Sequence, residues 1–202
     1  MSQTLATADL GLRERKRLAT HARIADEAAK LATSKGLAAV TIDDIAEAAE
    51  IGRATFFRYF DAKETAVAEG FSVPWMRLVI DNLEVQPSDL SPVAAIAETF
   101  RGFAGVLDNG GRELILQQAR MSQASPGLRA WTLSVYVRFE HAIADAVADR
   151  FTDLVPGDPR PRLVGALTMS AVRICLDTWL DGEGEGDLPS MLQDALATVE
   201  VR

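Results

Sequence analysis

The chain has 202 residues, of which 48% are hydrophobic and 25% are charged, as expected of a soluble globular protein with one sizeable core or two small ones. No apolar run approaches the length of a membrane span, and the first residues lack the apolar block of a signal peptide, so we expect a cytoplasmic protein with no membrane partner. The single cysteine, Cys175, excludes an internal disulfide and a cysteine metal cluster, and its apolar neighbours indicate a small buried side chain.

The net charge of −8 is distributed unevenly along the chain. Up to Thr65, ten lysines and arginines balance ten acidic residues, so the excess acidity belongs to the larger remaining part. A basic segment near the N-terminus, in which Glu14 is the one acidic residue, contains Arg13, Arg15, Lys16, Arg17 and Arg23. This segment could follow a DNA backbone and add a salt-dependent share of affinity. The alternative is a solvated, disordered tail.

The first predicted elements are an arm and a helix. Residues 1–12 show no periodicity and are interpreted as a disordered arm. The apolar stripe that follows predicts a helix from about residue 13 to 34, closed by a basic last turn at Lys35 and a stop at Gly36. With the two short helices after it, this helix should enclose a small core made of Ile24, Leu31, Ile42, Ile45, Ile51, Phe56 and Phe60.

The stretch TIDDIAEAAEIGRATFFRYFDAK, residues 41–63, predicts two short helices joined by a tight turn. Thr41 and Asp44 form a capping box in which Asp replaces the usual Glu, so the first helix should start directly after Thr41. Phe56 and Phe60 are one turn apart on the second helix and point inward. The other faces of the second helix then carry basic, polar and aromatic side chains: Arg53, Thr55, Phe57, Arg58 and Tyr59.

A basic and aromatic surface on a very short helix suits the major groove of DNA. Arg53 can donate to guanine edges, and Phe57 can contact thymine methyl groups. Thr55 and Tyr59 can bind phosphates.

At these residues the chain resembles the tetracycline-repressor (TetR) family of bacterial transcription regulators. The resemblance covers about the first quarter to third of the chain, where TIDDIAEAAEIGRATFFRYFDAKETA follows the family's helix-turn-helix almost position by position. It implies that Arg53, Ala54 and Phe57 occupy base-reading positions and that Arg58 lies beside them. It implies phosphate-contacting positions at Thr41, Thr55, Tyr59 and Lys63.

The chain departs from the family pattern at three positions. Glu50 stands where the family usually has a turn glycine, so the turn should be strained. Gly52 stands where a serine cap is usual, so the second helix should be weakly capped. Phe57 stands where tyrosine is more common, which removes one hydroxyl from the groove surface. The motif remains intact, and the preferred DNA sequence is left open.

The rest of the chain is predicted to be helical, with no alternating strand pattern. A fourth helix should run from about residue 63 to 83 and bend or break near residues 71–73, because Pro74 lies inside it. Further helices are predicted at about residues 91–107, 113–122, 125–151, 161–180 and 188–199. We therefore predict an all-α fold with a three-helix DNA-binding domain at residues 13–62 and a helical ligand-binding and dimerisation domain at residues 63–202.

The sequence shows no catalytic or metal-binding pattern. Neither His21 nor His141 has a neighbouring Cys, His or paired carboxylate at metal-ligand spacing, and no nucleophile elbow or phosphate loop occurs. Each histidine is expected at the surface or at a helix cap. We therefore expect neither an enzyme nor a bound cofactor.

The resemblance implies a homodimer whose last two helices pack against their symmetry mates as a four-helix bundle. Residues with the required spacing, which could instead be ordinary core, are Leu163, Ala166, Leu167, Ala171, Ile174, Thr178, Leu188, Met191, Leu192, Ala195, Leu196 and Val199. Such a dimer would place two recognition helices about 34 Å apart, as a palindromic operator requires.

Candidate effector-binding residues are apolar or soft side chains with an occasional buried cation: Trp75, Phe100, Phe103, Arg120, Met121, Trp131, Arg138, Met169 and Arg173. Arginines recur on these apolar helices, Arg129 included, and would suit an anionic effector such as an acyl thioester. Residues 114–181 also weakly resemble the acyl-CoA-responsive branch of the family. The alternatives are that the apolar side chains are ordinary core and that the arginines form surface pairs with Glu140, Asp145 and Asp177.

The sequence thus predicts a transcription regulator that binds double-stranded DNA and a small-molecule effector. We expect a repressor that leaves a palindromic operator when a hydrophobic or acyl-type effector binds the C-terminal domain, with Pro74 near the helix that transmits the change. One alternative is a DNA-bound regulator without a ligand. The other is a small-molecule-binding protein with a vestigial DNA head.

Overall fold

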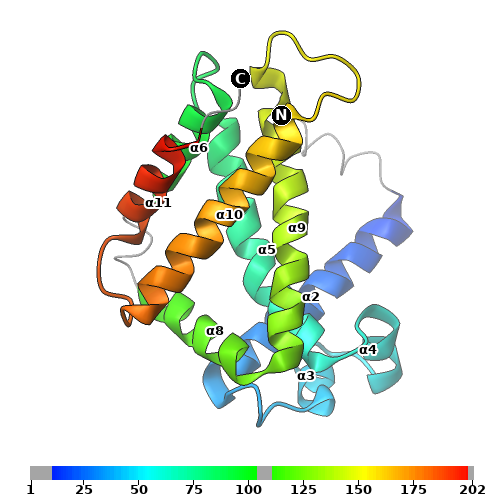
Figure 1. Ribbon diagram of the computed structural model, residues 1–202. Helices are drawn as coiled ribbons and strands as arrows, with labels where there is room; N and C mark the ends of the chain where they lie inside the picture. The colour runs from blue at the N-terminus through cyan, green and yellow to red at the C-terminus, as the bar shows by residue number, and fades with distance from the viewer. Residues whose placement is uncertain (1–10, 104–110, 200–202) are drawn as a thin grey trace. The chain divides into compact units, whose positions relative to one another are not determined.

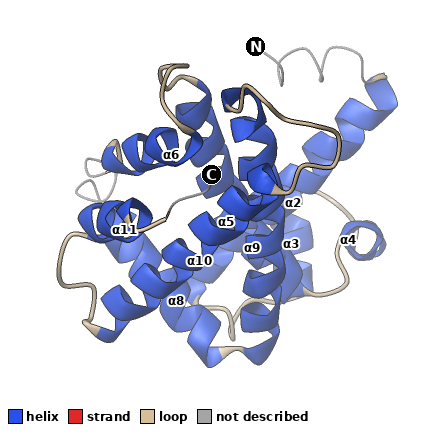
Figure 2. Cartoon of the chain, turned by 45° about the horizontal axis from the view of Figure 1, so that its top comes forward, coloured by secondary structure: helices blue, strands red, loops and turns tan. Residues whose placement is uncertain are grey.

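The computed structural model describes residues 11–103 and 111–199, and within these ranges the protein contains helices and no β-strand (Figure 2). This confirms the predicted all-α class. The chain forms two compact units, of which unit 1 ends at Val73 and unit 2 begins at Pro74. Residues 1–10 of the predicted arm lie outside the described residues, whereas Leu12 already belongs to helix α2 (Leu12–Lys35).

Unit 1 is built from α2, α3 (Ile42–Ala48), α4 (Arg53–Tyr59) and the first part of α5 (Lys63–Glu84). Apolar residues recur on one face of each helix, so burying those faces together brings the helices into contact. The buried residues of this unit include Ile24, Ala28, Ala32, Val40, Ile45, Ala49, Phe56, Phe60 and Val67. Three other residues predicted for this core are partly exposed: Leu31, Ile42 and Ile51.

Gly70 allows α5 to approach α2 closely. A Cβ atom at this position would lie 2.0 Å from the carbonyl oxygen of Ala25, far inside van der Waals contact. The two helices can therefore pack at this distance only because residue 70 has no side chain.

Helix α5 is continuous from Lys63 to Glu84 although Pro74 lies inside it. Proline removes one backbone donor and crowds the carbonyl four residues earlier, so a bend or break was expected near residues 71–73. No break occurs there. Buried residues fix the helix on both sides of the proline, Val67 before it and Leu83 after it, and this packing outweighs the local preference.

The boundary between the units falls at Pro74 and not after residue 62, where the sequence pattern placed the end of the DNA-binding domain. The first turns of α5 belong to unit 1 because their buried side chains, Ala66 and Val67, join its core.

Unit 2 contains the rest of α5 and a set of helices in the order α6 (Pro92–Arg101), α8 (Arg112–Ala124), α9 (Pro126–Val147), the 3-10 helix η2 (Ala148–Arg150), α10 (Arg160–Asp181) and α11 (Leu188–Ala197). Helices α9 and α10 lie side by side, and α11 packs against α6 and α10 (Figure 1). Their shared core includes Leu83, Ile96, Phe100, Leu116, Val135, Phe139, Ile143, Val164, Trp179, Leu192 and Leu196. The predicted extension of α6 towards residue 107 falls on residues 104–110, outside the described ranges.

The close packing of α9 against α10 depends on Gly165. A Cβ atom at this buried position would lie 2.2 Å from the carbonyl oxygen of Glu140, so the two backbones meet where no side chain intervenes. Helix α10 is also long and apolar enough to cross a membrane by length and composition, which the sequence analysis had not indicated. This is weak evidence, because core helices have the same composition, and 39% of the helix's most apolar window is buried in the protein.

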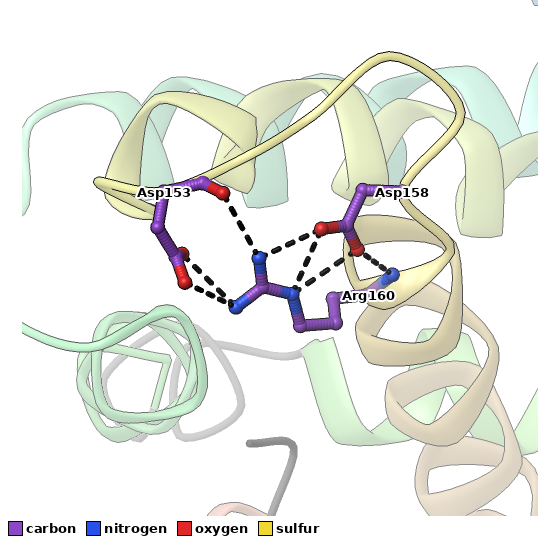
Figure 3. Close-up of polar contacts among 3 residues, drawn as sticks. All are labelled: Asp153, Asp158 and Arg160. Atoms are coloured by element: carbon purple, nitrogen blue, oxygen red, sulfur yellow. Dashed lines mark hydrogen bonds and ion pairs between the residues drawn. The ribbon is translucent and has the colours of Figure 1, made fainter.

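Arg160 anchors the connection that leads from η2 into α10 (Figure 3). Its guanidinium donates to both carboxylate oxygens of Asp158 at 2.7–3.1 Å and forms an ion pair with Asp153 at 3.0 Å. It also lies over the ring of Phe151, 5.3 Å from the centroid. The hydrogen bonds from Arg160 hold the pKa of Asp158 below its usual value. Arg160 therefore joins the loop residues Asp153 and Asp158 at the start of α10.

Arg150 binds backbone carbonyls at and just after the C-terminal end of α5. Its guanidinium donates to the carbonyl oxygens of Leu83, Gln86 and Pro87 at distances of 2.6–3.1 Å. These bonds tie η2 to the last turn of α5 and to the residues that directly follow it.

Candidate nucleic-acid interface

The N-terminus of α3 is fixed by the predicted capping box. The backbone N–H of Asp44 donates to Thr41 Oγ1 at 3.1 Å, and the backbone N–H of Thr41 donates to Asp44 Oδ2 at 2.8 Å. The Thr41 hydroxyl also donates to the same carboxylate at 2.5 Å. These bonds, with a smaller contribution from the nearby Lys35, lower the pKa of Asp44. The Thr41 side chain, predicted to contact phosphate, is thus already engaged in the cap.

The turn between α3 and α4 is a Schellman motif. The N–H of Ile51 donates to the carbonyl of Ala46, and the N–H of Glu50 donates to that of Glu47. Glu50 occupies the left-handed position of this motif with φ of 51°, where glycine is the usual residue. The strain predicted for this turn is therefore present.

Helix α4 presents its predicted reading face to solvent. Arg53, Ala54, Phe57 and Arg58 are exposed, with 46% of Phe57 accessible, while Phe56 on the opposite face is fully buried. Two further DNA-binding candidates are partly buried, Thr55 and Tyr59. The N-cap residue, Gly52, makes no side-chain capping bond, as expected.

The Arg53 guanidinium is held between two neighbours. Its Nη1 atom donates to Asp43 Oδ1 at 2.8 Å, and its Cζ atom lies 5.5 Å from the centroid of the Phe57 ring. Arg58 is placed in a similar way over the ring of Tyr59, also at 5.5 Å. The two arginines of α4 therefore lie against the aromatic residues that follow them.

Lys63 has a role that the sequence did not reveal. Its partly buried ammonium group donates to the carbonyl oxygens of Leu37 at 2.8 Å and Val40 at 2.7 Å. These carbonyls belong to the connection between α2 and α3, which Lys63 therefore fixes from the start of α5. An ammonium group has three donors, so one is left for a phosphate.

His21 is partly buried against aromatic residues of unit 1, with 28% of its side chain still exposed. Its ring stacks on Phe60 with 4.5 Å between centroids and meets Tyr59 edge-on. Its Nε2 atom lies 3.7 Å from Glu69 Oε2. The helical spacing from His21 to Ile24 and Ala28 was a signal that this side chain faces the core. His141 is exposed as expected, and its Nδ1 atom lies 2.8 Å from the carbonyl oxygen of Val137.

The basic segment near the N-terminus forms the first turns of α2. This excludes a disordered tail for residues 12–23. All five of its basic side chains are exposed: Arg13, Arg15, Lys16, Arg17 and Arg23. Arg17 donates to Glu14 at 2.7–3.0 Å, so part of its charge is compensated.

The candidate effector-binding residues of unit 2 differ in how deeply they are buried. Those in the core are Phe100, Phe103 and Met169, and those that are partly buried are Trp75, Met121 and Trp131. The arginines are all exposed: Arg120, Arg129, Arg138 and Arg173. The prediction of a buried cation among them is therefore wrong. Long charged side chains keep their heads in water, and here Arg138 stacks on Trp131 at 4.8 Å while Arg173 lies 4.0 Å from Asp177.

The predicted dimer face is exposed on α10 but not on α11. Leu163, Leu167, Ile174 and Thr178 form an exposed stripe along α10, while Ala166 is partly buried and Ala171 is buried. On α11, Leu188, Leu192 and Leu196 are buried in the core of unit 2. The remaining predicted positions are partly exposed: Met191, Ala195 and Val199. Assigning α11 to the interface was therefore wrong for its buried residues, because its apolar face is used against α6 and α10.

Helix α9 supplies exposed apolar residues that the sequence analysis did not select. Leu133 is 55% exposed and Val137 is 48% exposed, one turn apart on the helix that packs beside α10. Their i, i+4 spacing on the face opposite the core residues Val135 and Phe139 was the available signal.

No group of His, Cys, Asp or Glu side chains suited to a metal ion occurs within residues 11–103 and 111–199.

Comparisons with known proteins agree with this arrangement. Residues 24–69 match the family described as bacterial regulatory proteins, tetR family, and residues 90–202 match the MftR C-terminal domain. The HTH-type transcriptional regulator TcmR of Streptomyces glaucescens is 30% identical over 181 residues, which is 84% of this chain and 76% of that protein. The putative mycofactocin biosynthesis transcriptional regulator MftR of Mycobacterium tuberculosis is 32% identical over 151 residues, covering 70% of this chain and 73% of that protein.

Solved structures show the same fold. The FadR repressor of Thermus thermophilus, in complex with lauroyl-CoA, superposes with a TM-score of 0.60 at 22% identity, covering 88% of this chain and 91% of that one. FadR from Bacillus halodurans has a TM-score of 0.52 at 15% identity, covering 88% and 93%. With the helix-turn-helix of unit 1 and the helical unit 2 described above, these matches establish that the chain belongs to the TetR family of bacterial transcriptional regulators and is not an enzyme.

Proposed function

We propose that the protein is a homodimeric repressor that binds a palindromic operator through α4 and leaves it when an acyl-type effector binds unit 2. The observation that carries the proposal is the exposed face of α4, on which Arg53, Phe57 and Arg58 are presented above a buried Phe56. The arginine donors and the phenylalanine ring of this helix match the acceptors and methyl groups that base edges offer in the major groove.

Contacts to the DNA backbone would surround this reading face. Tyr59 and Thr55 flank it, and Lys63 retains one donor beside its two backbone bonds. Exposed cations on the first turns of α2 add positive charge, so binding should weaken as salt rises. Thr41 would contribute mainly by fixing α3, because its hydroxyl bonds Asp44.

The exposed apolar stripe supports dimerisation through α9 and α10. Leu133 and Val137 on α9, with Leu163, Leu167 and Ile174 on α10, leave large apolar side chains in water in a single chain. A second copy would bury them, and two-fold pairing of two helices from each copy gives a four-helix interface. The dimer would then present two α4 helices to the half-sites of a palindrome.

Two observations support an acyl-type effector. The chain shares its fold with a repressor solved with lauroyl-CoA, and the core of unit 2 contains Phe100, Phe103 and Met169, apolar side chains that would line a site for an acyl chain. Its exposed arginines could meet the anionic part of such a ligand at the surface. Binding would shift the population towards a spacing of the two reading heads that does not fit the operator. These activities belong in the cytoplasm, where the chromosome lies.

The effector proposal is tested with purified protein on labelled DNA that flanks its own gene, at fixed salt. Lauroyl-CoA is titrated into the complex, with coenzyme A as the control that lacks the acyl chain. We expect lauroyl-CoA to weaken DNA binding about tenfold or more and coenzyme A to leave it unchanged. If calorimetry detects lauroyl-CoA binding while the DNA affinity stays constant, the proposed response to acyl effectors is wrong.

A further inference from the structure

Asp43 is an acidic residue at a site where negative charge should oppose DNA binding. It lies in the first turn of α3 with 71% of its side chain exposed, and its partner Arg53 opens α4 with 56% exposed. The neighbouring Asp44 is fully explained by the capping box with Thr41. Asp43 takes no part in that cap, and within the described part of the chain its carboxylate accepts a hydrogen bond from Arg53.

The geometry of this bond leaves one edge of Arg53 for a base. The bond to Asp43 uses Nη1, and guanidinium groups present their N–H donors in a rigid, planar fork. The edge formed by Nε and Nη2 can therefore still donate two parallel hydrogen bonds. Guanine offers two acceptors, N7 and O6, at the spacing that such an edge recognises.

Two side-chain contacts and the helical backbone together restrict the Arg53 side chain. The carboxylate of Asp43 holds one end of the guanidinium at 2.8 Å, the ring of Phe57 supports it at 5.5 Å, and the backbone at Arg53 is fixed as the first residue of α4. An arginine held in one orientation loses less conformational freedom on binding than a free one. The carboxylate of Asp43 also offsets the positive charge of Arg53, which weakens the nonspecific attraction of Arg53 to phosphates.

We propose that Asp43 is a specificity-determining residue, which positions Arg53 to read guanine and reduces its affinity for phosphates. The proposal rests on the proposed role of α4 in base reading. Glu47 provides a matched control, because it lies one turn further along α3, is exposed, and forms no ion pair among the described residues. Each change removes one negative charge from α3, but only the change at Asp43 removes the ion pair with Arg53.

The test is selection from a pool of randomised DNA duplexes by the full-length protein and four variants, followed by affinity measurements on the selected sequences. The variants are Asp43→Asn, Asp43→Glu, Glu47→Gln and Arg53→Ala. We expect the unchanged protein to select guanine at a position where Arg53→Ala loses the preference. Asp43→Asn should reduce that preference about three- to tenfold and bind random duplexes as well as or better than the unchanged protein. Asp43→Glu should retain the preference, since a longer carboxylate can still reach Arg53.

The outcomes separate this inference from the function on which it rests. If Asp43→Asn behaves like Glu47→Gln, with the guanine preference intact, the role of Asp43 is refuted while base reading by Arg53 stands. If Arg53→Ala keeps every base preference, both the role of Asp43 and the reading role of Arg53 are refuted. A protein that selects no sequence at all would overturn the proposed function, and this inference with it.

Discussion

Substituting alanine for Gly165 should destabilise the protein, although alanine is normally the better helix residue. In an open helix position the change would stabilise by about 0.5–1 kcal/mol. At Gly165 the new Cβ would lie 2.2 Å from the carbonyl oxygen of Glu140, whereas ordinary contact begins near 3.4 Å. Helices α9 and α10 must then move apart by about 1 Å, and overpacking of this kind costs about 1–3 kcal/mol.

Thermal unfolding of purified Gly165→Ala measures this cost, which should lower Tm by a few degrees. Gly102→Ala is the matched control in unit 2, because its Cβ would lie 3.4 Å from the Thr99 carbonyl and its backbone is already in the right-handed helical region. We expect the control to be neutral or slightly stabilising. An unchanged or raised Tm for Gly165→Ala would refute the close approach of α9 and α10.

Three further changes test separate parts of the structure. Glu50→Gly should raise the stability of unit 1 by up to about 1 kcal/mol, since φ of 51° is strained for glutamate; a lower Tm would contradict the left-handed turn. Lys63→Met should lower stability by about 1–2 kcal/mol, because the carbonyls of Leu37 and Val40 lose their donor, and an unchanged unfolding midpoint would count against those bonds. Ile174→Glu should convert the proposed dimer to a monomer in sedimentation velocity, whereas Val155→Glu, at another exposed apolar residue, should not; a dimer that survives Ile174→Glu would exclude the α9–α10 interface.

The helix-turn-helix could be predicted from the sequence because its determinants are local. Thr41 and Asp44 are three residues apart, and the capping box they form needs no tertiary contact to be recognised. The inward pair Phe56 and Phe60 follows from helical spacing alone. The departure of Glu50 from the family pattern likewise predicted a strained turn, and its positive φ confirms it.

The features that the sequence did not reveal depend on partners distant along the chain. Lys63 bonds carbonyls more than twenty residues earlier, and His21 stacks on Phe60. Helix periodicity shows that α11 has an apolar face but not which surface covers that face, so its assignment to the dimer interface failed for Leu192 and Leu196. Of the bend or break predicted near Pro74, the break does not occur, because packing on both sides of the proline decides whether the helix continues.

Binding to the DNA that flanks the protein's own gene tests the central claim most directly. Fluorescence anisotropy at two salt concentrations would compare the unchanged protein with Arg53→Ala, using a random duplex of equal length as the reference. We predict selective binding that Arg53→Ala weakens by about 1–3 kcal/mol on the specific duplex, with little change on the random one. Equal losses on both duplexes, or no selectivity in the unchanged protein, would contradict the claim that α4 reads the DNA sequence.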